Sequence, residues 1–89
     1  MEQTNHYFYV LECSDGSYYA GYTVDINQRL KKHNNGTGAK YTRGRAPVKL
    51  LYSEEFATKS DALKMEISFK RLKRKEKEQY IYRTSNEER

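Results

Sequence analysis

The chain has 89 residues and a mass of 10.6 kDa, which is enough for one domain with one core. Its 17 Lys and Arg outnumber 12 Asp and Glu, and the net charge of +5 and pI near 9.3 favour a polyanionic partner, with nucleic acid as the first candidate. No apolar run approaches the roughly 20 residues of a membrane span, no signal peptide is recognised, and the single Cys13 excludes an internal disulfide. We therefore expect a monomeric, cytoplasmic domain held by an aromatic core.

The first part of the chain predicts a β-hairpin. Residues 6–13 place apolar side chains on both faces, which is typical of a central strand. Residues 14–17 form the turn, and residues 18–23 form a second, antiparallel strand. Gly21 is costly inside a strand, so we expect it to let another backbone or a ligand come close.

A helix follows the hairpin. Asp25 is a good N-cap, and Gly36 ends the element. Arg29 and His33 are four residues apart, so they are neighbours on the helix surface, beside the stripe that faces the core. Both side chains are therefore expected to lean toward the sheet.

The segment between Gly36 and Pro47 has no periodicity and is long for a connection in so small a domain, which is common for functional loops. No acidic residue occurs between Gly36 and Glu54. We expect this loop to contact nucleic acid through four residues: Lys40, Tyr41, Arg43 and Arg45.

The second part of the chain predicts a strand at 48–56, nearer the sheet edge, and a helix that begins at the capping box 58–61 and reaches about Leu72. A basic helix is expected at 73–82, and the run of cations from Lys64 to Lys77 includes Lys70, a further candidate for nucleic-acid binding. Together these elements predict an α/β domain over residues 6–82, with a small three-stranded antiparallel sheet flanked by helices in the order β-β-α-β-α-α. Residues 1–5 are expected to be disordered, and residues 83–89 to form a frayed polar tail.

Glu66 is the most informative anomaly of the sequence. On a helical projection it lies near the middle of the apolar arc of the helix that starts after Thr58. A carboxylate on a packing face is costly unless it is paired or binds a cation. Two interpretations are open: an ion pair with Arg29 or a bond to a tyrosine hydroxyl, or a metal ligand.

Together these positions resemble the GIY-YIG nuclease superfamily. Tyr7-Phe8-Tyr9 stands where the family has its first tripeptide, and Tyr19-Ala20-Gly21 where it has its second. Arg29 matches the arginine of the family's helix, and Glu66 matches its metal-binding glutamate. The segment 35–45 looks like the loop of small stand-alone bacterial members.

The tripeptides depart from the family pattern at three positions. Tyr7 replaces the glycine and Phe8 the isoleucine of the first, while Ala20 replaces the isoleucine of the second. Tyr9, Tyr19 and Gly21 are kept, so these changes concern local packing more than catalysis. The family's larger nucleases carry appended DNA-recognition domains, and none is expected in this chain.

The resemblance implies phosphodiester hydrolysis with one Mg²⁺ or Mn²⁺ ion on Glu66. Such a reaction needs a base, a cation and a metal. Arg29 would hold the phosphate, Tyr9 or Tyr19 would take the proton from water, and cations such as His33 and Lys40 would assist the phenol. The resemblance favours Tyr9, and spacing alone does not separate the two tyrosines.

The function predicted is therefore a metal-dependent endonuclease that acts on nucleic acid, with DNA favoured and structure-selective action in repair or recombination as the context. Two alternatives are a nucleic-acid-binding module without catalysis and a subunit docked on a protein partner that supplies specificity. The net charge and the acid-free loop support the first alternative. Glu66 argues against it, because a purely electrostatic binder gains nothing from a carboxylate on a packing face.

Overall fold

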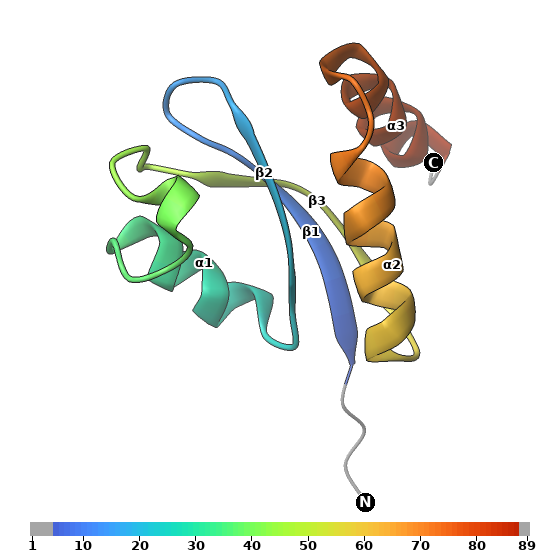
Figure 1. The fold of residues 1–89 in the computed structure, drawn as a ribbon, viewed down its shortest axis with the longest axis horizontal. Coiled ribbons are helices and arrows are strands. Elements are labelled where there is room, and N and C mark those ends of the chain that lie inside the picture. The colour runs from blue at the N-terminus through green and yellow to red at the C-terminus, as the bar shows by residue number, and fades with distance from the viewer. Residues whose placement is uncertain (1–4, 88–89) are drawn as a thin grey trace, which may run out of the picture.

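The computed structural model describes residues 5–87, which form one antiparallel sheet with helices on both faces (Figure 1). The strands are β1 (His6–Glu12), β2 (Tyr18–Thr23) and β3 (Lys49–Phe56), and the helices are α1 (Ile26–Asn34), α2 (Lys59–Lys70) and α3 (Arg74–Glu87). A single 3₁₀ turn, η1 (Lys40–Thr42), lies in the loop between α1 and β3. The predicted fold class and element order are confirmed.

The sheet has the order β2-β1-β3, so β1 is the central strand, as predicted, and β3 is an edge strand. Tyr9 lies opposite Gly21 in the pairing with β2, and opposite Ser53 in the pairing with β3. Successive residues of a strand point to opposite faces. Phe8 and Tyr9 therefore serve different sides of the sheet.

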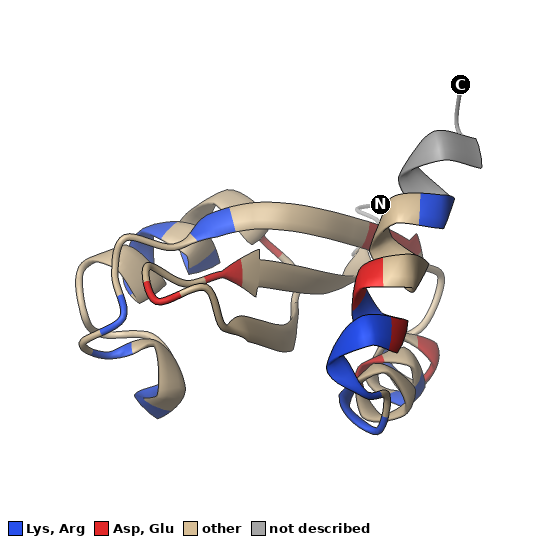
Figure 2. Cartoon of the chain, turned by 90° about the horizontal axis from the view of Figure 1, so that it is seen from above, with Lys and Arg blue, Asp and Glu red and all other residues tan. Residues whose placement is uncertain are grey.

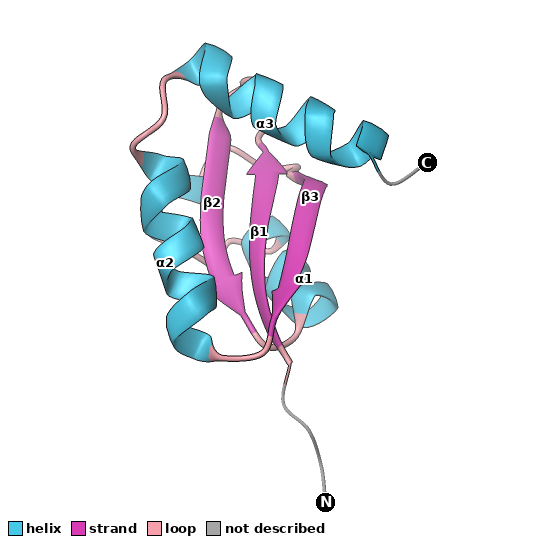
Figure 3. Cartoon of the chain, turned by 90° about the vertical axis from the view of Figure 1, so that its right-hand side faces the viewer, coloured by secondary structure: helices cyan, strands magenta, loops and turns pink. Residues whose placement is uncertain are grey.

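The two faces are covered by different elements. Figure 1 shows α1 and the η1 loop on one side of the sheet and α2 on the other. Figure 3 shows α2 beside β2, while α3 crosses the strands near one end of the sheet. Arg74 at the start of α3 donates to the Gly16 carbonyl oxygen (2.9 Å), which ties α3 to the β1–β2 turn.

Helix starts follow the capping residues that the sequence indicates. The Asp25 carboxylate accepts from the backbone N–H of Gln28 (3.0 Å), and the Thr58 hydroxyl accepts from that of Asp61 (3.1 Å). Helix ends are less well predicted. α2 ends at Lys70, two residues before Leu72, and α3 continues five residues beyond Tyr82.

Helix α3 thus includes residues 83–87, for which the sequence predicted a frayed tail rather than a helix. No Gly or Pro follows Tyr82, so the sequence has no stop signal for α3. Residues 88–89, and residues 1–4 of the segment expected to be disordered, lie outside the described residues. None of the helices within residues 5–87 has the length and apolar character needed to cross a membrane.

The face toward α2 and α3 carries an apolar core. Its buried members are Phe8, Val10, Ala20, Tyr52 and Phe69. The predicted apolar arc of α2 is too wide, because Ile67 at its far edge is 54% exposed. Glu66 stays within the narrower packing face and is half-buried.

Candidate active site

A hydrogen-bonded chain of three buried side chains lies between the sheet and α1. The Tyr9 hydroxyl is 2.9 Å from His33 Nε2, and His33 Nδ1 is 2.8 Å from the Thr42 hydroxyl. His33 and Thr42 have no exposed surface, and Tyr9 is 2% exposed. Strand β1, helix α1 and turn η1 each supply one member, so the fold brings together residues that are far apart in sequence.

The proton positions in this chain follow from the Thr42 hydroxyl. It donates to the Ala39 carbonyl oxygen (2.9 Å), so its lone pairs accept the hydrogen on His33 Nδ1. The backbone N–H of Ala39 points at Nδ1 from 3.4 Å, a longer hydrogen bond that is lost when Nδ1 carries the hydrogen. His33 Nε2 is then unprotonated and accepts the hydrogen of the Tyr9 hydroxyl.

The charges of the site fit this arrangement. Burial, and secondly the positive charge of Arg29, lower the pKa of His33 below its ordinary 6.5, so the imidazole is neutral at neutral pH. A neutral imidazole adds no positive charge, which differs from the expectation that His33 assists as a cation. Burial raises the pKa of Tyr9 to about 12, against the opposing effect of Arg29.

Arg29 is the cation next to the tyrosines. Its interactions with the Tyr9 hydroxyl, and more weakly with Tyr19, raise the pKa of the guanidinium. Its Nε is buried and has no hydrogen-bond partner among the described residues. Buried donors are nearly always paired in folded proteins, so this atom is a spare donor beside the two hydroxyls.

Two glycines leave space for the hydrogen-bonded side chains of Tyr9 and His33. A Cβ at Gly21 would lie 2.6 Å from the Tyr9 hydroxyl oxygen, and a Cβ at Gly38 would lie 2.5 Å from His33 Nδ1. Gly21 thus allows a close approach, as expected, but the group that approaches is the Tyr9 side chain. Gly38 was not predicted as a site residue.

Tyr19 lies above this buried layer and is part of an aromatic stack. Its ring is 6.3 Å from that of Tyr9, 5.2 Å from that of His33, and stacked on Tyr41 at 6.0 Å. Lys70 Nζ is 5.8 Å from the centre of the Tyr19 ring. Tyr19 therefore joins the buried hydroxyl chain to the more exposed residues of the loop and α2.

Glu66 is neither fully buried nor paired with Arg29. Its side chain is 18% exposed and accepts from Lys70 Nζ at 2.7 Å, four residues further along α2. The ion pair is thus local and differs from the partners expected. The Glu66 charge also acts on Tyr9, whose pKa it raises slightly.

The acidic side chains near Glu66 determine which kind of metal site is possible there. No group of three or more His, Cys, Asp or Glu side chains able to enclose a metal ion occurs within residues 5–87. Mg²⁺ is commonly held by one or two carboxylates together with water and substrate phosphate. Glu66 beside Lys70 fits such a shared site and does not fit one made of protein ligands alone.

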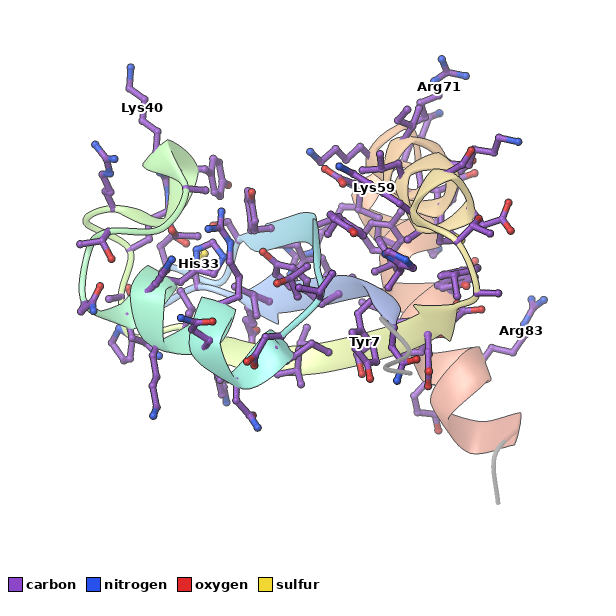
Figure 4. The ribbon with its side chains drawn as sticks, turned by 90° about the horizontal axis from the view of Figure 1, so that it is seen from below. Tyr7, His33, Lys40, Lys59, Arg71 and Arg83 are labelled. Atoms are coloured by element: carbon purple, nitrogen blue, oxygen red, sulfur yellow. The ribbon has the colours of Figure 1, made fainter. Side chains whose placement is uncertain are left out.

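The cations of the loop have different surroundings. Lys40 and Arg43 are exposed, and Figure 4 shows Lys40 pointing away from the body of the molecule. Arg45 instead forms an ion pair with Asp15 (3.0 Å), lies 4.2 Å from the centre of the Tyr41 ring, and donates to the Tyr41 carbonyl oxygen (2.6 Å). The loop does have an acidic neighbour, which comes from the β1–β2 turn.

A pocket of about 310 Å³ lies next to Tyr19. It extends between the η1 loop and the helices α2 and α3. Figure 2 shows Lys and Arg gathered on these two flanks, with largely uncharged strands between them. Its lining residues are Tyr18, Tyr19, Ala20, Tyr41, Phe69, Lys70 and Lys77.

Comparison with known proteins assigns the family. Residues 5–87 match the family model described as the GIY-YIG catalytic domain. The chain belongs to the GIY-YIG family. This confirms the resemblance carried by the two tripeptides, Arg29 and Glu66, and it places the chain in a family of nucleases.

Small UPF0213 proteins are similar over most of the chain. One from Bacillus licheniformis is 63% identical over 81 residues, covering 91% of this chain and 84% of the relative. The UPF0213 protein YazA of Bacillus subtilis is 54% identical over 86 residues, covering 97% and 87%. The solution NMR structure of an E. faecalis protein is 53% identical and has a TM-score of 0.66, covering 96% of this chain and 92% of that one.

Proposed function

We propose that this GIY-YIG domain is a metal-dependent endonuclease that hydrolyses phosphodiester bonds in DNA. The observation that carries the proposal is the meeting of Tyr9, neutral His33 and Arg29 at one point. This arrangement combines a hydroxyl bonded to a proton acceptor with a cation that has a spare donor. Structure-selective cutting of DNA in the cytoplasm, in repair or recombination, is the biological setting that we propose.

Arg29 provides the charge that hydrolysis needs. A phosphate under attack gains negative charge on its non-bridging oxygens, and a guanidinium offers them several donors in a fixed plane. The guanidinium already lies beside the Tyr9 and Tyr19 hydroxyls. A phosphate bound there would face both tyrosines.

Tyr9 and His33 provide the path for the proton. Because the pKa of Tyr9 is about 12, its hydroxyl is protonated near neutral pH and cannot take a proton unless it gives up its own. His33 Nε2, 2.9 Å away, accepts that proton while the phenol oxygen takes the proton of the attacking water.

Glu66 would hold the metal ion, and Mg²⁺ or Mn²⁺ is the ion we propose. When bound, the ion supplies charge stabilisation at the phosphate and the leaving oxygen. Lys70 pairs with the same carboxylate, so an ion held by Glu66 would have to displace the Lys70 ammonium. Lys70 can then neutralise a phosphate of the substrate.

A nucleic-acid-binding module without catalysis is the second candidate. The ion pair between Glu66 and Lys70 favours it, because a carboxylate already paired does not require a metal. A third arrangement, a subunit whose specificity comes from a protein partner, adds a partner to either function. These candidates differ in whether the chain alone cleaves DNA.

The test is cleavage of linear, flapped and branched DNA and RNA by the full chain, with and without Mg²⁺. Cleavage should require the ion, favour DNA and be lost in Glu66→Gln, which keeps the volume of the side chain and removes its charge. Glu55→Gln, an exposed glutamate on β3, is the matched control and should cleave normally. Binding without cleavage of any substrate would favour the second candidate.

A further inference from the structure

We propose that the pocket beside Tyr19 binds one unpaired nucleobase of the substrate. The proposal rests on the proposed function and narrows it, because it makes the substrate a nucleic acid with an unstacked base next to the cut. A base within duplex DNA is covered on both faces by its neighbours, so only a single-stranded, flapped or flipped base can enter.

The walls are aromatic rings that are held in place from outside. Tyr41 carries Arg45 at 4.2 Å from its ring centre, and Tyr18 carries Arg74 at 3.7 Å. Neither arginine lines the pocket. The two rings are therefore braced before a ligand arrives, and such aromatic surfaces are what nucleobases stack on.

Ala20 forms part of the floor. It is 5% exposed and lines the pocket together with the ring of Phe69. The family's second tripeptide has isoleucine at this position, a side chain with three more carbon atoms. The smaller residue in this chain leaves space where the larger one would project, which connects a departure in the motif to the pocket.

The pocket straddles the outer edge of the sheet. Tyr18 and Ala20 face α2, Tyr19 faces the η1 loop, and β2 has no strand beyond it in the described sheet. At the hairpin turn, the backbone N–H of Cys13 donates to the Ser17 carbonyl oxygen (2.8 Å), so these two residues form a hydrogen-bonded pair. Since antiparallel pairing alternates, the backbone groups of Tyr18 and Ala20 are directed away from β1, where they can pair with the edge of a base.

The rim carries the charges for the sugar-phosphate chain. Lys70 and Lys77 line the pocket on its helix side, whereas Lys40, next to Tyr41 in the loop, points away from the body of the molecule (Figure 4). A pocket of about 310 Å³ lies at the small end of the usual range for ligand sites, which suits a flat ring with its phosphate outside. Tyr19 borders both this pocket and the Arg29 site, so the base would lie next to the phosphate that is cut.

Binding in the presence of EDTA tests this without any cleavage. Fluorescence anisotropy would compare a short labelled oligothymidine, a strand of the same length that is abasic at every position, and a blunt duplex. We expect the wild-type chain to bind the full strand about tenfold more tightly than the abasic strand, at the scale of one stacked base. The salt dependence of the two strands should be equal, because their phosphates are equal.

Two variants locate the effect. Tyr41→Ala removes a wall and should abolish the preference for the full strand, while Ala20→Ile fills the floor and should do the same. Tyr82→Ala, a change of a 72% exposed tyrosine on α3, is the matched control and should keep the preference. Circular dichroism would check that each variant is folded, and Tyr41→Ala decides the test if Ala20→Ile does not fold.

Equal affinity of the wild type for the full and abasic strands would overturn the pocket assignment. So would a preference that persists in Tyr41→Ala. A base preference without DNA cleavage would support the pocket and contradict the nuclease proposal. Cleavage without a base preference would do the opposite, so the two proposals can fail separately.

Discussion

The two faces of the sheet bury different kinds of side chain, although neighbouring residues of β1 supply both. On the face toward α2 and α3, Phe8 packs against Phe69 and Tyr52 with no exposed surface. On the face toward α1, Tyr9 has a polar partner in His33 and a charged neighbour in Arg29. One face holds the domain together by apolar burial, and the other keeps polar groups buried in a defined arrangement.

On the polar face, the stability of the arrangement depends on whether each polar group has a hydrogen-bond partner. Placing a hydroxyl and an imidazole in the interior beside a half-buried guanidinium is costly, and each must find a partner. Tyr9, His33 and Thr42 satisfy one another, whereas Arg29 Nε has no partner within the described part of the chain. The unsatisfied donor is therefore the place at which we expect the substrate.

The largest effect is expected on the apolar face. Phe8→Ala should lower the free energy of unfolding by about 3–5 kcal/mol, the usual loss for a buried aromatic ring. Urea denaturation would measure it. Phe8→Leu, which keeps most of the volume, should remain folded and cleave DNA normally, and a loss of cleavage there would mean that the two faces are not separate.

The next effect is expected at the cation of the polar face. Arg29→Ala should reduce the cleavage rate by about 10²-fold or more, since one preorganised charge stabiliser is lost. Affinity for DNA should change far less. Arg43→Ala, an exposed arginine on the loop, serves as control in single-turnover kinetics, and equal losses of rate in the two variants would contradict a special role for Arg29.

Acid should lower both the free energy of unfolding and the cleavage rate through His33 on the polar face. Below pH 6.5 the unfolded chain protonates His33, whereas the folded chain, with a lowered pKa, does not until the pH is lower still. The unfolded state then binds more protons, so stability falls as the pH falls below 6.5. The cleavage rate should fall once His33 is protonated in the folded state, because Nε2 no longer accepts the Tyr9 proton.

Urea denaturation between about pH 7 and about pH 5 would measure this loss of stability. His33→Gln should show a smaller dependence on pH. A wild type whose stability does not change over this range would contradict the buried, neutral state of His33.

The smallest effect is expected on the loop. Because Arg45 is paired with Asp15, Lys40→Ala and Arg43→Ala should each reduce the salt dependence of DNA binding by about one phosphate contact, and Arg45→Ala by less. Titrations at several salt concentrations would measure the slopes. An equal or larger change for Arg45→Ala would show that its pairing with Asp15 breaks on binding.

Local signals in the sequence predicted much of the fold. The apolar residues on both faces of β1 indicated a central strand, and Asp25 and Thr58 indicated the helix starts, because these features depend on near neighbours. The same spacing argument brought Arg29 and His33 to one face of α1. The length of α3 was missed because nothing in its sequence ends the helix.

The contacts of the site are mostly long-range, and the sequence did not contain them. Tyr9 and His33 are 24 residues apart, and Asp15 and Arg45 are 30 apart. Thr42 and Gly38 gave no signal beyond their place in a cationic loop. The Glu66–Lys70 pair did have one, since residues four apart on a helix are neighbours, and it could have been found by that rule.

The most direct test of the central claim is the cleavage rate of Tyr9→Phe, measured together with its thermal unfolding. The change removes only the hydroxyl that bonds His33. We predict a loss of cleavage of about 10²-fold at unchanged DNA affinity, and a smaller loss for Tyr19→Phe. A Tyr9→Phe protein that unfolds at a lower temperature but cleaves at the wild-type rate would contradict the account, because the hydroxyl would then serve the fold alone.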